Sequence, residues 1–223
     1  MKQEFVERII SSDLILVGIG KEFEEIKYQC MADAIEALQK LKIILQGKNY
    51  FVITTCTNSI LYEAGFEKER VVSPCGNMRK KQCPNKCEGS LKSLNDTEIE
   101  QIKSDVEVLE KGILGTCAKC GEELVLNNVY AHMYDENGYL DAWKFYTKWL
   151  QGTLNKKLCI LELGVDLGFP TIIRWPFEKV AFYNQKAVLI RVNDKLYHIP
   201  EELMEKGISI ASNAIDWIME KEV

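Results

Sequence analysis

Four cysteines occur in two close pairs, Cys83-Pro-Asn-Lys-Cys87 and Cys117-Ala-Lys-Cys120. Cysteine pairs at this spacing are typical of tetrahedral zinc sites, because both sulfurs of one pair can reach a single ion within a tight turn. Two disulfides or four unrelated thiols are the alternatives. We predict a structural Zn²⁺ site, since four thiolate ligands leave no coordination position open for a substrate or a water molecule.

Small or polar residues follow three apolar runs of the sequence. Gly18 lies within the run that begins at position 13, and Gly20 ends it. Thr54 and Thr55 end the run 50–55, and Asn193 follows the run 187–192. Ligands of open α/β sheets bind at the carboxyl ends of strands, where small residues let backbone N–H groups approach a phosphate. The Gly18-Ile-Gly20 pair lacks the third glycine of a dinucleotide fingerprint, so a tight strand-to-helix turn is an equal alternative.

Apolar runs that alternate with amphipathic stretches predict the elements that position these residues. We expect buried strands over 13–20, 50–55, 70–73, 158–164 and 187–192. We expect helices over 23–46, 97–111, 141–154 and 211–221, and a short helix that follows the second strand and runs through Ala64. Strands joined by helical crossovers indicate a parallel sheet. The predicted fold is α/β, with a Rossmann-like sheet covered by helices on both faces (1–74 and 126–223) and a small inserted zinc-binding module (75–125).

Composition and charge exclude several classes of protein. A chain of 223 residues that is 47% hydrophobic can form one large domain with a satellite. The N-terminus carries charges of both signs and leads into no long apolar segment, so we expect a cytoplasmic protein with reduced thiols and no membrane partner. A net charge of −5 argues against nucleic acid as a partner. The basic cluster Arg79, Lys80, Lys81 and Lys86 is interpreted either as a contact for an anion or another chain, or as a solvated face.

Several motifs in order resemble the sirtuins, which are NAD-dependent protein deacylases and ADP-ribosyltransferases. The motifs are Gly18-Ile-Gly20, then Ile53-Thr-Thr-Cys-Thr-Asn-Ser-Ile-Leu-Tyr-Glu-Ala-Gly65, Val71-Val-Ser-Pro-Cys-Gly76, the two cysteine pairs, Leu161-Glu-Leu-Gly-Val165, Pro170-Thr-Ile-Ile-Arg-Trp-Pro-Phe-Glu178 and Ile190-Arg-Val-Asn193. The last three are similar to "LELGVG", "TP…IIRYPFE" and "IRLN" of the divergent, macrodomain-linked bacterial sirtuins. The resemblance covers nearly the whole chain.

This resemblance implies a sirtuin or DHS-like NAD-binding fold and a role for each matching residue. The cofactor-binding positions are Gly18, Gly20, Thr54, Thr55, Gly76, Gly164 and Asn193, and the metal ligands are Cys83, Cys87, Cys117 and Cys120. The implied ligands are Zn²⁺ and NAD or ADP-ribose, and the implied partner is an acylated or ADP-ribosylated protein. ADP-ribosyl transfer ranks above deacetylation, because the most similar branch is the macrodomain-linked one.

The chain departs from the sirtuin pattern at the catalytic positions. Cys56 stands where the family has asparagine, Asn58 where it has aspartate, and Cys75 where it has the histidine base. A cysteine with a pKa near ~8.5 is a poorer base at neutral pH than a histidine near ~6.5. The loop after Gly20 also lacks the serine, proline and arginine of the family. His132 and His198 do not fall on the catalytic position, and we interpret them as surface or packing residues.

Three functions are consistent with this sequence. The first is an NAD-consuming transferase with substituted catalytic residues, in which Cys56 and Cys75 are nucleophiles or redox-sensitive thiols. The second is a sirtuin-like pseudoenzyme that binds NAD or ADP-ribose as a sensor or scaffold, in which both cysteines are small buried residues. The third is a zinc-stabilised interaction protein without a nucleotide ligand.

Overall fold

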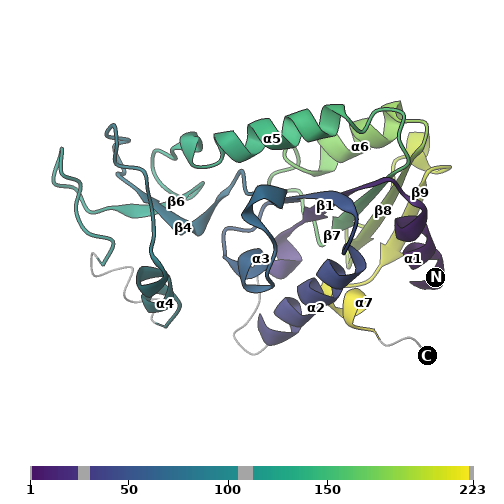
Figure 1. The fold of residues 1–223 in the computed structure, drawn as a ribbon, viewed down its shortest axis with the longest axis horizontal. Helices are drawn as coiled ribbons and strands as arrows, with labels where there is room; N and C mark the ends of the chain where they lie inside the picture. The colour runs from purple at the N-terminus through teal and green to yellow at the C-terminus, as the bar shows by residue number, and fades with distance from the viewer. Residues whose placement is uncertain (1, 25–30, 105–112, 221–223) are drawn as a thin grey trace. The chain divides into compact units, whose positions relative to one another are not determined.

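The computed structural model of this chain describes residues 2–24, 31–104 and 113–220 (Figure 1). The chain divides into two compact units. The larger unit consists of residues 1–56, 60–72 and 142–223, and the smaller unit consists of residues 57–59 and 73–141. No helix among the described residues has the length and apolar character that crossing a membrane requires.

The larger unit contains a six-stranded parallel sheet with the order β3-β2-β1-β7-β8-β9. Its strands are β1 (Leu14–Ile19), β2 (Asn49–Thr54), β3 (Val71–Val72), β7 (Leu158–Leu163), β8 (Ala187–Asn193) and β9 (Gly207–Ala211). The chain builds outward from β1 in one direction and then returns to add β7, β8 and β9 on its other side. The direction of winding therefore reverses between β1 and β7, and such a switch point is where ligands of open α/β sheets bind.

Helices cover both faces of this sheet, as the sequence predicts (Figure 1). They are α1 (Lys2–Ser11), α2 (Met31–Ile44), α3 (Ile60–Glu63), α5 (Leu140–Gln151), α6 (Arg174–Tyr183) and α7 (Ala214–Met219), with 3₁₀ turns η1 (Lys21–Phe23), η3 (Lys68–Arg70) and η6 (Glu201–Leu203). Successive strand residues point to opposite faces. Accordingly, Ile15 and Val17 of β1 share one core with α2 and α7, whereas Gly18 lies against α6.

The aromatic stripe of α5 packs mainly against β2. The ring of Phe51 lies 5.4 Å from Tyr146 and 5.8 Å from Trp149. Phe145 instead has 67% of its surface exposed. Tyr146 and Trp149 therefore face the sheet, whereas Phe145 does not.

The smaller unit is built on a three-stranded antiparallel sheet with the order β5-β4-β6. Its elements are β4 (Gly76–Gln82), β5 (Lys92–Ser93), α4 (Asp96–Ser104), β6 (Val125–Asn128) and the 3₁₀ turn η5 (Glu136–Gly138). Among the described residues of this unit, the buried side chains of Leu94, Ile99, Ile102 and Leu114 form an apolar core. The unit extends beyond the module predicted over 75–125, because β6 pairs with β4 and buried Gln82 accepts hydrogen bonds from Asn127 and Asp135.

Several elements of this fold were not predicted from the sequence. They are strand β9, helices α1 and α6 and the small antiparallel sheet. The final helix begins at Ala214 instead of position 211, because residues 207–211 extend the sheet as β9. Parts of three predicted helices, residues 25–30 of 23–46, 105–111 of 97–111 and 221 of 211–221, lie outside the described residues.

Candidate functional site

The carboxyl ends of β2, β1, β7 and β8 lie side by side at one edge of the larger unit's sheet. Backbone hydrogen bonds continue past the strands there: the N–H of Thr55 donates to Ile19 O (3.1 Å), that of Gly20 to Leu163 O (2.9 Å) and that of Gly164 to Val192 O (2.8 Å). Four of the predicted cofactor-binding residues, Thr54, Thr55, Gly20 and Gly164, therefore stand on adjacent strand ends. Asn193 completes the row at the end of β8.

Gly20 and Gly164 allow the chain to pass very close to itself at the switch point. A Cβ on Gly20 would overlap the Cα of Val165 and lie 2.5 Å from the carbonyl oxygen of Gly164. Gly164 has φ +61°, and a Cβ there would lie 2.6 Å from the Cβ of Glu22. A glycine is required at both positions because the neighbouring atoms are mostly backbone or the start of a side chain, which cannot move aside cheaply.

Gly18 serves a different purpose from Gly20. It lies inside β1, and a Cβ there would come within 2.5 Å of Ile173 and 2.8 Å of Phe177. This glycine makes room for helix α6 to approach the sheet. Its predicted part in cofactor binding stays a prediction.

The side chains at the end of β2 are turned inward. The Oγ1 of Thr54 accepts a hydrogen bond from the N–H of Cys56 (3.0 Å), and the thiol of Cys56 donates to the carbonyl oxygen of Gly20 (3.1 Å). Cys56 is 1% exposed. This thiol therefore ties the end of β2 to the end of β1.

Asn193 holds the turns that follow β7 and β8. Its Nδ2 donates to the carbonyl oxygen of Val165 (3.1 Å), and its Oδ1 accepts from the N–H groups of Lys195 (2.9 Å) and Leu196 (2.7 Å). The side chain is 5% exposed. Its structural role is to fix the loop geometry at this edge.

A buried ionic network under the same edge was not foreseen from the sequence. Glu162 of β7 pairs with Arg174 of α6 (3.0 Å) and Arg191 of β8 (2.9 Å), and Arg191 also pairs with Glu178 (2.7 Å). Burial raises the pKa of Glu162, and the two guanidinium groups oppose that rise. One signal was available, because Glu162 and Arg191 are charges inside buried strand runs and lie opposite each other in the register.

Arg174 links this network to the strand-end loops. Its Nη2 donates to the carbonyl oxygen of Val165 (2.8 Å), and its Nη1 donates to that of Leu196 (3.0 Å). These are the same loops that Asn193 holds. The ends of β7 and β8 are therefore fixed from both the sheet and helix α6.

The remaining catalytic and cofactor positions belong to the smaller unit, whereas Cys56 belongs to the larger one. Cys75 is fully buried, and its carbonyl oxygen accepts a hydrogen bond from Val129 (2.9 Å). Gly76 has φ +81°, and a Cβ there would overlap backbone atoms of Asn127 and Asn128. Asn58 is half-buried. The roles predicted for Cys75, Gly76 and Asn58 stay predictions.

The two histidines of the chain lie on exposed segments. His132 is exposed in the loop after β6, and His198 is exposed with its ring stacked on Tyr197 at 4.3 Å.

The two cysteine pairs converge on one point of the smaller unit. The sulfurs of Cys83, Cys87, Cys117 and Cys120 all lie within 4.8 Å of one another, and those of Cys83 and Cys120 are 3.5 Å apart. Gly121 has φ +77° just after the second pair, as a tight turn requires. Four sulfurs at these separations suit a tetrahedral ion with metal–sulfur bonds of about 2.3 Å, so the cluster is compatible with zinc.

Backbone groups around the cluster favour thiolates. N–H groups of Lys119 and Cys120 lower the pKa of the Cys117 thiol to about 6. The N–H of Asn85 donates to the sulfur of Cys83 (3.3 Å). Such hydrogen bonds orient and stabilise metal ligands.

The basic cluster predicted as an anion contact or a solvated face is largely used within the smaller unit. Lys81 pairs with Glu98 at 2.7 Å and also donates to Leu114 O. Lys80 donates to the carbonyl oxygen of Gly138, and Arg79 lies 3.8 Å from Asp96. These contacts connect β4 to the elements around it.

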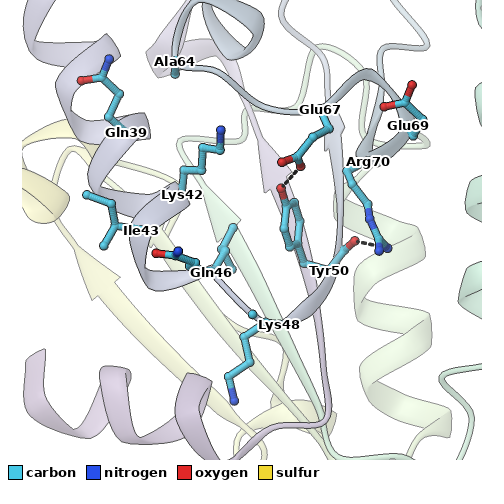
Figure 2. A pocket seen from close by; sticks show the side chains of 12 residues that line it. Gln39, Lys42, Ile43, Gln46, Lys48, Tyr50, Ala64, Glu67, Glu69 and Arg70 are labelled. Atoms are coloured by element: carbon cyan, nitrogen blue, oxygen red, sulfur yellow. Dashed lines mark hydrogen bonds between the residues drawn. The ribbon is translucent and has the colours of Figure 1, made fainter.

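A polar cavity of about 900 Å³ lies at the opposite edge of the larger unit's sheet, near the amino ends of β2 and β3 (Figure 2). Within it Tyr50 donates to Glu67 (2.7 Å), Arg70 donates to Tyr50 O (3.2 Å) and Lys42 donates to Gly65 O. Its charged groups therefore serve local packing. This cavity is separate from the strand-end residues, which lie where α/β folds bind ligands.

Two curated relatives match the chain. It is 23% identical over 176 residues to a "Protein ADP-ribosyltransferase" of Staphylococcus aureus (strain Mu50), and the match covers 78% of this chain and 56% of the relative. It is 26% identical over 172 residues to a "Probable bifunctional ADP-ribose hydrolase/ADP-ribosyltransferase" of Fusarium oxysporum f. sp. cubense, covering 73% of this chain and 29% of the relative. The chain thus spans about half or less of these relatives. No family model matches it.

Solved structures that resemble the chain are sirtuins. A sirtuin structure concerned with substrate affinity has a TM-score of 0.62 at 15% identity and covers 98% of this chain and 95% of its own. A structure of Sir2 with a p53 peptide and NAD⁺ has a TM-score of 0.62 at 13% identity, with the same coverage. A Sir2 homologue in complex with ADP-ribose has a TM-score of 0.56 at 14% identity, covering 98% and 94%. The resemblance seen in the motifs is therefore confirmed in three dimensions, and this chain has the sirtuin fold.

Proposed function

We propose that this chain binds NAD or ADP-ribose at the carboxyl ends of β1, β2, β7 and β8 and transfers ADP-ribose to a protein, in preference to protein deacylation. The observation that carries the proposal is the close backbone passage of Gly20 and Gly164 at the switch point of the sheet. The names of the two curated relatives, which include ADP-ribosyltransferase, support transfer. Neighbouring sirtuin structures that contain NAD⁺ or ADP-ribose support the ligand class.

ADP-ribosyl transfer needs a proton acceptor in addition to a nucleotide site. The bond between ribose C1′ and the nicotinamide nitrogen breaks, a bond between C1′ and the acceptor atom forms, and the acceptor group loses its proton. Cys75 and Asn58 stand at positions that match catalytic ones in the resemblance. A buried thiol is a weak base at neutral pH, so we expect turnover to be slow.

A nucleotide-binding pseudoenzyme is the second candidate function. Cys56 favours it, because its thiol is buried and already donates to the carbonyl oxygen of Gly20. A side chain used in this way links two strand ends and is not directed at a ligand. On this alternative the chain binds NAD or ADP-ribose without breaking the bond to nicotinamide.

We also propose that Cys83, Cys87, Cys117 and Cys120 hold one Zn²⁺ with a structural role. Their sulfurs surround a single point of the smaller unit. When bound, the ion supplies cross-links between two segments that are far apart in the sequence.

Nicotinamide release and ligand binding, measured on the purified zinc-loaded chain, test these functions. Release of nicotinamide from NAD together with labelling of an acceptor protein supports the transferase. Binding of ADP-ribose without nicotinamide release supports the pseudoenzyme, and Cys75→His and Cys56→Asn then test whether the substituted positions limit catalysis. If neither NAD nor ADP-ribose binds at millimolar concentration, both proposals are wrong and a zinc-stabilised interaction protein is the remaining function.

A further inference from the structure

The side chain of Glu22 lies across the carboxyl ends of three neighbouring strands. Residue 22 belongs to η1, immediately after β1, and its N–H donates to Gly164 O at the end of β7 (3.2 Å). Its carboxylate accepts hydrogen bonds from the N–H of Asp194, after β8 (3.0 Å), and from the N–H of Ala214, after β9 (2.6 Å). One residue thus spans the half of the strand-end edge that β7, β8 and β9 form.

The contacts of Glu22 fix its carboxylate in this position. Its Cβ lies against Gly164, where even an added methyl group would not fit. Burial raises the pKa of Glu22, and the N–H groups of Asp194 and Ala214 oppose that rise. Asp194 and Asp216 add negative charge nearby. The group is half-buried and used on both oxygens, which distinguishes it from an ordinary surface glutamate.

This position coincides with one half of a dinucleotide site. A dinucleotide lies across the switch point of an open α/β sheet, with one nucleoside on each side of it. One nucleoside therefore lies over the ends of β1, β2 and β3, and the other over the ends of β7, β8 and β9. The backbone N–H groups of Asp194 and Ala214 are donors in the second half, and Glu22 already occupies both.

We infer that Glu22 is an internal competitor of the nucleotide, whose carboxylate must leave the N–H groups of Asp194 and Ala214 before a nucleoside can bind over β7–β9. This inference rests on the proposed nucleotide site, and it concerns how tightly that site binds its ligand. When only a fraction of the molecules is in the conformation that can bind, the apparent affinity for the ligand falls in proportion to that fraction. The negative charge of Glu22 also opposes the phosphates of any nucleotide that approaches.

Removal of the Glu22 carboxylate is expected to strengthen nucleotide binding. Hydrogen bonds to a charged acceptor each correspond to about a tenfold or greater change in an equilibrium constant, so Glu22→Ala should lower the Kd for ADP-ribose by at least about tenfold. Glu22→Gln keeps the size of the side chain but offers only one acceptor oxygen, and it should also lower the Kd. Glu24→Ala is the matched control, because it removes the same charge from the same turn and leaves the contacts of Glu22 in place.

Calorimetric titration of the full zinc-loaded chain and these variants with ADP-ribose and with NAD is the experiment. Tighter binding by Glu22→Ala and Glu22→Gln, with Glu24→Ala equal to the unaltered chain, supports the inference, as does binding by the Glu22 variants alone. Equal or weaker binding by the Glu22 variants overturns the inference and leaves the nucleotide site intact. If the unaltered chain and all variants fail to bind, the proposed nucleotide site and the inference are both wrong. Should Glu22→Ala not fold, Glu22→Gln carries the same comparison.

Discussion

At the scale of single residues, the switch point depends on atoms that have no room to move. Gly20 faces the backbone of Val165, and Gly164 faces the Cβ of Glu22. Gly168 provides a contrast, because a Cβ there would meet only the end of the Asp166 side chain. Alanine at position 20 therefore tests how closely the backbone packs there, whereas alanine at position 168 is expected to disturb little.

Gly20→Ala is expected to destabilise the fold and to abolish nucleotide binding. Forcing a methyl group into packed backbone costs about 1–3 kcal/mol of unfolding free energy, and the neighbouring strand ends must separate to accommodate it. Chemical denaturation measures this loss, with Gly168→Ala as the control that should change stability by less than about 0.5 kcal/mol. A Gly20→Ala variant as stable as the control would contradict the close passage.

Glu162→Gln is expected to be strongly destabilising. It removes the negative charge shared by Arg174 and Arg191, which are almost fully buried, so that Arg174 loses its ion pair with Glu162 and Arg191 keeps its pair with Glu178. Breaking a buried ion pair in this way costs about 3–5 kcal/mol. The exposed pair of Glu36 and Lys40 on α2 gives the control, since Glu36→Gln should cost less than about 1 kcal/mol. Denaturation midpoints that agree for the two variants would show that the network does not fix the strand-end loops.

At the scale of elements, the strands of the larger unit other than β9 were predictable, and the antiparallel sheet was not. Every residue of β1 and β7 is buried, and both strands are apolar apart from Glu162 of β7; such runs indicate a parallel strand covered on both faces. The sequence of β4 is Gly-Asn-Met-Arg-Lys-Lys-Gln, which is typical of a solvent-exposed stretch. Only the structure shows that its lysines have partners. Helix α6 was not predicted, because a proline such as Pro176 usually indicates that a helix is interrupted. A proline is nevertheless tolerated in the first turn of a helix.

Only those features of the candidate site that depend on local sequence were predictable. Glycines and polar residues after apolar runs identified Gly20, Thr55 and Asn193 as strand-end residues, and the family resemblance added Gly164. Glu22 was not identified, because its partners Asp194 and Ala214 are brought to it only by the order of the strands. The orientation of Cys56 toward Gly20 likewise depends on the spacing of two strand ends.

The smaller unit is expected to depend on the zinc that we propose it holds. Among its described residues, four buried side chains form the apolar core and one strand is only two residues long. A small unit that binds a metal through four cysteines commonly depends on that metal for its fold. We predict one zinc per chain by mass spectrometry, and loss of hydrogen-exchange protection in β4 and β6 after chelation.

Protection in β1, β7 and β8 provides the internal control for chelation, because these strands have their own core. Cys120→Ser should reproduce the effect of the chelator. A smaller unit that stays protected without metal would show that the cysteine cluster does not stabilise it.

At the scale of the whole molecule, the chain has the sirtuin fold, and we predict that Cys56, Asn58 and Cys75 stand at the positions of the family's catalytic residues. The fold supplies a switch point with rigid strand ends, and the chain covers half of that edge with its own carboxylate. On our proposal, nucleotide binding and catalysis are therefore separable properties of this chain. A nucleotide site can persist in this scaffold while the chemistry is slow or absent.

Mapping of ADP-ribose binding by backbone amide NMR tests the central claim most directly. We predict that the largest shifts occur at Gly20, Thr55, Gly164 and Asn193, on the carboxyl ends of the strands. Amides beside the cavity of Figure 2, such as those of Lys48 and Tyr50 at the opposite edge, should change little. Shifts that concentrate around that cavity, or no shifts at millimolar ADP-ribose, would contradict a nucleotide site at the switch point.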